Sequence, residues 1–356
     1  MIKNIKQTLQ YIQRIILFVR MEFKKNISLG VLSFLNTSQK GFFSISPILY
    51  NFKERNSEDF ISDWKRLNNI SKLNNKRRLV LDDKLIFHVM NKNNSNVKPI
   101  VAITKNNSLY KNNKEFDEII VEKDLRNFLL NFENGLIIKP VTGGGGGHIS
   151  KIHLVNNEIV FQGDCTTKKD FIEKVIKGKR EFLLTEIIKQ DGLCSEIYPH
   201  TLNTLRILTF IDPKSNKPFI SRAVQRFGTK ESNVVDNWTA GGISVAVDIN
   251  DGTMGMGASY PKKNDLKVKW YKAHPDTKKT FYGCKIPHWE LIKNLTLELS
   301  SSYSYLPYIG WDIVYTKDSI YVLEGNTNSD LNLLQIHGGL LTNVRNKVFY
   351  KHHNII

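Results

Sequence analysis

Near its C-terminus the chain reads GWDIVYTKDSIYVLEGN over residues 310–326. Two apolar runs flank the turn Thr316–Ser319, a pattern typical of two paired antiparallel strands. The start of the first strand of such a pair lies beside the end of the second, so we expect Asp312 to lie near Glu324 and Asn326. Since Glu324 and Asn326 are two residues apart, their side chains should face the same side of the strand.

These three side chains offer two carboxylates and one amide oxygen, which are the hard donors that Mg²⁺ prefers. Mg²⁺ keeps its other positions for water and substrate phosphates, and two such ions stabilise phosphoryl transfer. The alternative is a pair of acids that cap the strand turn and are neutralised by nearby lysines. Because Asp312 follows Trp311 and precedes an apolar strand, an ionised group there needs a strong partner. We therefore predict a metal site on Asp312, Glu324 and Asn326, with two Mg²⁺ ions and Mn²⁺ as the alternative.

Five glycines follow the sequence IIKPVT of residues 137–142, namely Gly143, Gly144, Gly145, Gly146 and Gly147. A chain accepts the entropic penalty of adjacent glycines where its backbone must approach another group closely, and the N–H groups of such a loop can converge on phosphate oxygens. No Gly-Lys-Ser/Thr follows, and the loop joins two expected strands rather than leading into a helix. An unliganded hairpin tip is the alternative, but Lys139 at the end of the strand favours phosphate binding.

The order of expected elements indicates an α+β protein. Residues 1–78 carry helical patterns, including Ser57–Leu73 with Ser57 as its N-cap. Short strands and helices follow from Leu79 onward. We expect helices at 124–132, 168–177 and 289–301, and strands at 100–104, 135–140, 158–162, 181–188, 205–212, 219–227, 243–248, 311–316 and 319–324.

Composition narrows the class of protein. With 356 residues, 41% of them hydrophobic and 24% charged, the chain has enough apolar residues for a folded core. Cys165, Cys194 and Cys284 are too scattered for a disulfide framework, which favours a reducing compartment and a cytoplasmic location. The net charge is +17, but the basic residues are dispersed without an arginine-rich block or interleaved aromatics. We therefore predict an anionic substrate and no nucleic-acid partner.

The N-terminal segment 1–20 combines basic residues with a five-residue apolar run, Ile15–Val19. This run is far too short to span a membrane. We expect a basic amphipathic helix that packs on its own domain. Contact with a membrane surface, at the inner membrane face, is the less favoured alternative.

A lysine before a glycine-rich strand–strand loop, followed by a late hairpin with Asp…Glu-x-Asn, resembles the ATP-grasp superfamily. Lys84 looks like the early lysine of that superfamily, and the segment 183–188 resembles its hinge strand, whose backbone reads adenine and whose acid meets the ribose. The segments 203–207, 226–228 and 236–242 are similar to the sugar-transfer-associated ATP-grasp branch found among bacterial surface-polysaccharide genes. The resemblance covers about residues 80–340.

The resemblance implies an ATP-grasp fold, in which two α/β lobes clamp ATP. We expect a mostly helical N-terminal region at 1–78 and a small lid lobe with the glycine loop at 79–186. A large lobe with the metal and substrate residues should follow at 187–356.

The resemblance also implies an activity. ATP-grasp ligases phosphorylate a carboxylate with ATP, and an amine then attacks the acyl phosphate to give an amide. The predicted function is therefore a carboxylate–amine ligase of capsule or O-antigen biosynthesis. Its substrates would be small molecules, such as a uronic acid and an amino acid, or a sugar-nucleotide or lipid-linked glycan. One alternative is an ATP-grasp kinase acting on a sugar-like hydroxyl, with His200 as the only modest candidate base. The other is a non-catalytic nucleotide-binding module, because Gly310 stands where D-alanine-ligase-like relatives carry an arginine.

The implied site residues fall into three groups besides the metal ligands. ATP is assigned to Lys84, Lys139, the five glycines 143–147, Glu186 and Ile187. Catalysis, meaning stabilisation of the carboxylate and the transferring phosphoryl group, is assigned to Arg206 and Arg226. Substrate binding is assigned to Arg222, Asp236, Asn237, Gly241 and Gly242, with Asn332 and Gln335 as weaker candidates.

Overall fold

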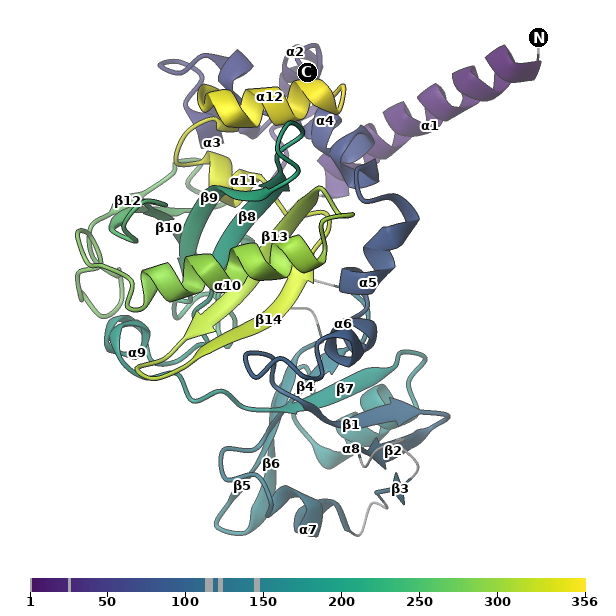
Figure 1. Cartoon of the computed structure of the whole chain (residues 1–356), viewed down its shortest axis with the longest axis vertical. Helices are drawn as coiled ribbons and strands as arrows, with labels where there is room; N and C mark the ends of the chain where they lie inside the picture. Colours follow the sequence, from purple (N-terminus) through teal and green to yellow (C-terminus); the bar gives the residue numbers. More distant parts are fainter. Residues whose placement is uncertain (1, 25–26, 113–117, 121–123, 144–147) are drawn as a thin grey trace.

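The protein consists of two seven-stranded antiparallel sheets with helices around them (Figure 1). The structure, a computed structural model, describes residues 2–24, 27–112, 118–120, 124–143 and 148–356. The first sheet has the strand order β3-β2-β1-β7-β4-β5-β6. Its strands are β1 (Ile100–Lys105), β2 (Ser108–Lys111), β3 (Glu118–Ile119), β4 (Leu136–Pro140), β5 (Ser150–Val155), β6 (Glu158–Gly163) and β7 (Phe182–Glu186). Its core also takes in apolar side chains of helix α7 (Leu125–Leu129) and of the π-helical turn Phe171–Ile176, which continues α8 (Lys168–Asp170).

The second sheet has the strand order β12-β11-β10-β9-β8-β13-β14. Its strands are β8 (Leu205–Ile211), β9 (Pro218–Phe227), β10 (Ile243–Val247), β11 (Met254–Ser259), β12 (Trp270–Tyr271), β13 (Tyr308–Tyr315) and β14 (Ile320–Asn326). All residues of β8 and β13 are buried, because both faces of this sheet are covered. The C-terminal segment adds α9 (Leu193–Ile197), α10 (Trp289–Ser302), α11 (Asn332–Gln335) and α12 (Val344–His352).

The two faces of the second sheet carry different cores. Ile207 on one face of β8 packs in a cluster with Ile292 and Leu299 of α10. Leu208 and Phe210 on the other face belong to a cluster shared with the N-terminal region and with the C-terminal helices. This division follows from the two-residue period of a strand. It also places Arg206 on the face of Leu208, just beyond the apolar covering.

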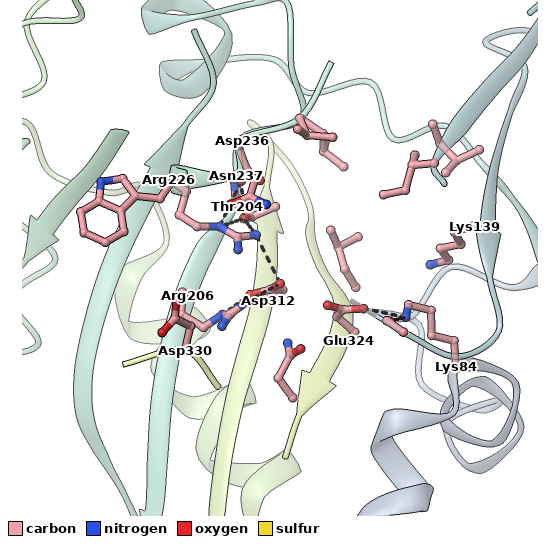
Figure 2. A pocket seen from close by; sticks show the side chains of 18 of the residues that line it. Lys84, Lys139, Thr204, Arg206, Arg226, Asp236, Asn237, Asp312, Glu324 and Asp330 are labelled. Carbon is pink, nitrogen blue, oxygen red and sulfur yellow. Dashed lines mark hydrogen bonds and ion pairs between the residues drawn. The ribbon is translucent and has the colours of Figure 1, made fainter. Parts of the chain in front are cut away.

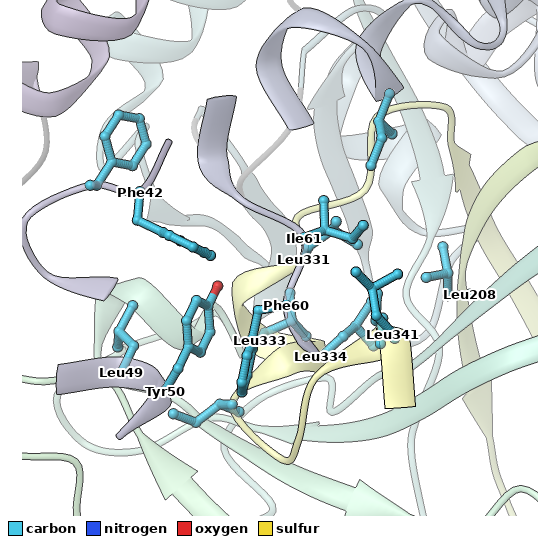
Figure 3. Packing of buried hydrophobic residues seen from close by; sticks show 14 of the residues in the cluster. Phe42, Leu49, Tyr50, Phe60, Ile61, Leu208, Leu331, Leu333, Leu334 and Leu341 are labelled. Carbon is cyan, nitrogen blue, oxygen red and sulfur yellow. The ribbon is translucent and has the colours of Figure 1, made fainter. Parts of the chain in front are cut away.

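The N-terminal region covers that second face. Its helices are α1 (Ile2–Lys24), α2 (Val31–Ser38), α3 (Ser46–Tyr50) and α4 (Asp63–Asn68). Figure 3 shows Tyr50 and Phe60 packed among leucines of the C-terminal segment, such as Leu333 and Leu334. Asn74 extends the contact, because its side-chain amide donates to the carbonyl oxygens of Tyr308 and Thr327.

The predicted helix over 57–73 is wrong as a single element. Its first residues form only a short 3₁₀ turn, and the cap of this turn is Asn56 rather than Ser57. Phe60 is extended, and the side chain of Gln335 accepts from Ile61 N–H at 2.8 Å and donates to the Ile61 carbonyl at 3.0 Å. This tertiary contact outweighs the local helical spacing, and α4 starts only at Asp63. By contrast, the predicted α+β class is confirmed, and every predicted strand is present, with ends that move by a few residues.

Residues 79–97 contribute more of their buried apolar side chains to the core of the second sheet than to that of the first. Leu81, Phe87 and Val97 lie in the core cluster that contains Trp311 and Val322. Helices α5 (Leu79–Asp82) and α6 (Lys84–Met90) run along β14 in Figure 1. The division of the chain at residues 78 and 186 stays a prediction, and this packing favours a lid boundary near the start of β1.

No helix in the described part of the chain combines the length and the apolar character that a membrane crossing requires.

Candidate active site

A cavity of about 480 Å³ lies between the two sheets. It is bordered by β4 and β7 of the first sheet, by β8, β9, β13 and β14 of the second, and by the start of α6. Figure 2 shows basic side chains that reach into this space from both sides, with acidic side chains between them. Of the predicted site residues, the structure brings Lys84, Lys139, Gly143, Glu186, Arg206, Arg226, Asp236, Asn237, Asp312, Glu324 and Asn326 to its wall.

The hairpin of β13 and β14 has the predicted geometry. Asp312 is the Cα partner of Glu324, and Gly310 is the partner of Asn326. All three predicted metal ligands line the cavity. The hairpin therefore presents two carboxylates and an amide on one wall, as its period-two pattern predicted.

Asp312 is held by two arginines from neighbouring strands. Arg206 donates through Nε to Asp312 Oδ1, and through Nη2 to Asp312 Oδ2 at 2.9 Å. Arg226 adds a bond from Nη2 to Asp312 Oδ2 at 3.2 Å. Burial raises the pKa of Asp312, but the two guanidinium charges outweigh burial and hold this pKa below its usual value. A two-pronged arginine–carboxylate contact of this kind fixes both groups in position.

Arg226 extends the network to a second acid. Its Nε lies 3.3 Å from Asp236 Oδ2, and the same carboxylate oxygen accepts from the Thr204 N–H at 2.9 Å. Burial raises the pKa of Asp236, while Arg226 acts in the opposite direction. Arg206, Arg226, Asp312 and Asp236 thus form one cluster with two positive and two negative groups, which we call the arginine–aspartate cluster.

Gly310 makes room for Arg206. A Cβ atom at residue 310 would lie 2.4 Å from Ser329 Oγ and 3.4 Å from Arg206 Cδ. Ser329 Oγ accepts from Arg206 Nη1 at 2.8 Å, so both neighbours are held where they are. Ser329 and Arg206 therefore occupy the space that a side chain at residue 310 would enter. The cavity thus contains an arginine, Arg206, although residue 310 itself is a glycine.

A second cluster of charged side chains lies on the side of the cavity nearer the first sheet. The Asp83 side chain caps α6 by accepting from Leu85 N–H, and it thereby positions Lys84. Lys84 Nζ donates to the Gly143 carbonyl at 2.7 Å and lies 3.3 Å from Glu324 Oε2. Lys139 lines the same wall, and burial lowers its pKa to about 8, with Glu324 raising it and Lys84 lowering it. Lys84, Lys139 and Glu324, which we call the lysine–glutamate cluster, carry one more positive than negative group.

The donors fit Mg²⁺ in kind. Within the described residues no group of three or more histidine, cysteine or acidic side chains is placed to hold a metal ion alone. Two carboxylates and the Asn326 amide suit an ion that also uses water and nucleotide phosphates. Asp312 already has two cationic partners, so any metal at this wall depends on Glu324, Asn326 and the phosphates as much as on Asp312.

Some predicted residues do not reach this cavity. The Arg222 side chain donates to the Gly338 carbonyl at 3.2 Å, and Gly241 borders a different cavity. Gly242 approaches the Asp236 and Asn237 carbonyls, and Ile187 N–H donates to the Gly135 carbonyl at 3.2 Å, so neither contributes to the wall. Asn332 and Gln335 are buried against the N-terminal region. Gly144, Gly145, Gly146 and Gly147 lie outside the described residues, but β4 and β5 pair antiparallel on either side of them, as expected for a strand–strand loop.

The predicted site residues did not include three residues of the cavity wall and one histidine near Lys139. Thr204 and Ser329 hold the arginines, and Asp330 lines the cavity. His88 lies buried on α6, where its Nδ1–H donates to the Lys84 carbonyl at 2.7 Å. Burial, followed by the charge of Lys139, lowers the pKa of His88 to about 4, so its ring is neutral near pH 7. Thr204 lies within the family-like segment 203–207, and Ser329 and Asp330 follow closely on Asn326, whereas no sequence signal indicated His88.

Comparisons with solved structures give distant likenesses. A RiPP-associated ATP-grasp ligase from Chryseobacterium gregarium is 12% identical, with a TM-score of 0.39, and the match covers 77% of this chain and 60% of that one. N5-carboxyaminoimidazole ribonucleotide synthetase from Thermotoga maritima is 11% identical, with a TM-score of 0.34, and 69% and 41% are covered. D-alanine–D-alanine ligase from Bacillus anthracis is 15% identical, with a TM-score of 0.36, and 77% and 69% are covered. The chain thus spans less than two thirds of the first two relatives.

No curated protein sequence matches the chain. The model of one protein family does, and it is described as sugar-transfer associated ATP-grasp. The match runs over residues 65–348, which include both sheets and the whole cavity wall. The chain therefore belongs to the sugar-transfer-associated ATP-grasp family.

Proposed function

We propose that this protein is an ATP-dependent carboxylate–amine ligase. The γ-phosphoryl group of ATP passes to a substrate carboxylate oxygen, which gives ADP and an acyl phosphate. An amine then attacks the acyl carbon, the bond from that carbon to the phosphate oxygen breaks, phosphate leaves, and loss of a proton from the nitrogen gives the amide. The observation that supports this most strongly is one cavity with a positively charged lysine–glutamate cluster on one side and the arginine–aspartate cluster on the other.

ATP phosphates are assigned to the lysine–glutamate cluster. Lys84 and Lys139 approach from α6 and β4, and the glycine loop begins at Gly143 beside Lys84. Their excess positive charge favours a polyanion over a neutral ligand. Glu186, at the end of β7 on the same wall, is assigned to the ribose.

The substrate carboxylate is assigned to Arg226. All three guanidinium nitrogens of Arg206 are used by Asp312 and Ser329. Arg226 uses Nε and Nη2, and its Nη1 has no hydrogen-bond partner among the described residues. Arg226 can therefore donate to a carboxylate or a transferring phosphoryl group while Arg206 keeps Asp312 and Arg226 in position.

Mg²⁺ is the implied cofactor, with Mn²⁺ as the alternative, and Asp312, Glu324 and Asn326 would hold it. When bound, it neutralises charge on the β- and γ-phosphates. The residues around it exclude water and orient the reacting groups.

The substrate class is proposed from charge and family. The chain carries a net charge of +17, which favours acidic sugars, and its family is described as sugar-transfer associated. A uronic acid and an amino acid, or a nucleotide- or lipid-linked glycan, in surface-polysaccharide biosynthesis fit both facts. Three free cysteines and the use of ATP support a cytoplasmic location.

The test is incubation of the full chain with ATP, Mg²⁺ and pools of uronic acids and amino acids, followed by measurement of ADP and of product mass. A joined product that has lost one water supports the ligase. A substrate that has gained a phosphate and kept its carboxylate supports the kinase instead. Nucleotide binding without ADP formation in any pool supports the non-catalytic module. Glu324→Gln serves as the inactive control.

A further inference from the structure

Helix α1 carries two apolar stripes, and the protein uses only one of them. The inner stripe faces the N-terminal region: Phe18 is buried and stacks on Phe43 with ring centroids 4.9 Å apart, and Tyr11 contacts Trp64 edge to face at 6.0 Å. The outer stripe is exposed and consists of Leu9, Ile12, Ile16, Val19 and Phe23. These five residues follow one another at spacings of three and four, so they form a single line along the helix.

Helix α2 continues this exposed line. Phe23 contacts Phe34 of α2 with ring centroids 6.0 Å apart, and α2 turns Val31, Leu32 and Leu35 outward. Leu32 is 80% exposed and Ile16 is 59% exposed, so neither side chain belongs to the core of the protein. We call the five residues of the outer stripe and these three the N-terminal apolar surface. A contiguous set of this size marks an interaction surface more often than an accident of composition.

The charge of the same segment is one-sided. Residues 1–53 contain eight lysines and arginines and one acid, Glu22. Glu22 is fully buried, and its carboxylate accepts from Ser28 Oγ at 2.7 Å and from Ser44 N–H at 3.1 Å. No acid of this segment therefore faces outward beside the exposed Arg20 and Lys24.

This charge distribution selects the partner. A second copy of the chain would bring two such helices together with basic residues on both and no acid from the segment to pair with them. A bilayer that contains anionic lipids offers apolar chains to the stripe and negative headgroups to the arginines and lysines. Figure 1 shows α1 reaching away from the body of the protein toward the N-terminus, where such a surface has access to it.

We propose that the N-terminal apolar surface binds an anionic phospholipid bilayer, with α1 lying in the plane of the interface. The apolar side chains enter the headgroup–acyl boundary, and the exposed Arg20 and Lys24 remain at the headgroups. This binding goes beyond the proposed ligase activity and does not depend on it.

The test is co-sedimentation of the full chain with vesicles of phosphatidylglycerol and phosphatidylcholine in equal parts, compared with pure phosphatidylcholine. We expect binding only to the anionic vesicles and weakening by salt. Ile12→Gln with Ile16→Gln should lower the partition coefficient at least about tenfold, because two exposed apolar side chains are lost without any loss of core. Leu291→Gln on α10, where Leu291 is 60% exposed, is the matched control and should bind as the parent does.

Arg20→Gln with Lys24→Gln should weaken binding by about fivefold per charge, whereas Lys214→Gln with Lys217→Gln, on an exposed turn, should not. Thermal unfolding of each variant checks that its fold is retained. Equal binding to neutral vesicles, or no loss in the Ile12 and Ile16 variant, would overturn the proposal. So would a parent chain that ignores vesicles but dimerises through the same residues, because the partner would then be a second copy.

Discussion

The two charged clusters in the cavity differ in how completely their partners satisfy them. In the arginine–aspartate cluster the side chains of Arg206 and Asp312 are only 7% and 6% exposed, and positive and negative groups are equal in number. In the lysine–glutamate cluster Glu324 has one ion-pair partner at 3.3 Å, and Lys139 has no hydrogen bond or ion pair within the described residues. The charges of the first cluster balance one another within the protein, whereas the second cluster still lacks an anion.

This difference separates two roles in one site. A balanced, buried network stabilises the fold and holds its members in fixed positions. A cluster with excess positive charge contributes less to stability and more to anion binding. We therefore expect the loss of Arg206 to act mainly on stability, and changes in the second cluster to act mainly on nucleotide binding and turnover.

The largest effect should come from Glu324→Gln. The variant keeps the shape of the side chain but removes the charge that pairs with Lys84 and that is assigned to the metal. Turnover should fall by about a thousandfold, a loss typical of a removed electrostatic group at a reacting phosphate. The free energy of unfolding should fall by about 1–3 kcal/mol, because the pair is largely buried but Lys84 Nζ keeps its hydrogen bond to the Gly143 carbonyl. Asp318→Asn in the exposed turn of the same hairpin is the control, and equal turnover in both variants would refute the metal assignment.

Arg206→Met should lower the free energy of unfolding more than Glu324→Gln does. Removal of Arg206 leaves Asp312 buried with Arg226 alone, which should lower the free energy of unfolding by about 3–5 kcal/mol. Chemical denaturation would measure this loss. Arg222→Met on the neighbouring strand, which removes one contact to a carbonyl, should lower it by only about 1 kcal/mol. If the double variant Arg206→Met and Asp312→Leu is no more stable than Arg206→Met, the unpaired charge is not the cause.

Gly310→Ala tests how tightly the arginine–aspartate cluster is packed. The new Cβ would meet Ser329 Oγ at 2.4 Å, so we expect a loss of about 1–3 kcal/mol in the free energy of unfolding. The double variant with Ser329→Gly removes that contact and should recover most of the loss. Full stability of the single variant would show that Arg206 and Ser329 are free to move.

The smallest effect concerns pH. The pKa of Lys139 is about 8 without ligand, and bound phosphates would raise it. Below that pH Lys139 is protonated in both states, so affinity is highest; above it, binding requires proton uptake. The affinity for ATP should therefore fall by up to about tenfold per pH unit above pH 8.

Calorimetric titration between about pH 7 and about pH 10 would measure the pH dependence. Lys139→Arg is the control, because arginine stays charged throughout this range and should flatten the profile. An unchanged slope in Lys139→Arg would assign the pH dependence to another group.

How well the site could be predicted depends on how far apart its residues lie in the sequence. Asp312 and Glu324 belong to one hairpin, so the two-residue period was enough to predict that they face each other. The pairing of Arg206 with Asp312 joins strands about a hundred residues apart, and no local pattern contains it. Arg222 and Arg226 both lie on β9 and share its two-residue period, yet only Arg226 reaches the cavity. At Arg222 the strand has left the cavity, and the Arg222 side chain contacts the Gly338 carbonyl instead.

The fold shows the same limit. The strands were predicted because each has its own apolar pattern, whereas the helix expected over 57–73 is interrupted by Gln335, which comes from the other end of the chain. The functional roles of the site residues stay predictions, because a measurement of the reaction is needed to test them.

Trapping of the activated carboxylate tests the central claim most directly. The full chain is incubated with ATP, Mg²⁺, hydroxylamine and each uronic acid or amino acid, and hydroxamate and ADP are measured together. An acyl phosphate formed in the cavity should yield equal amounts of hydroxamate and ADP with at least one acid, and none with the Glu324→Gln variant. ADP formed together with a phosphate ester, and without hydroxamate, would contradict the account.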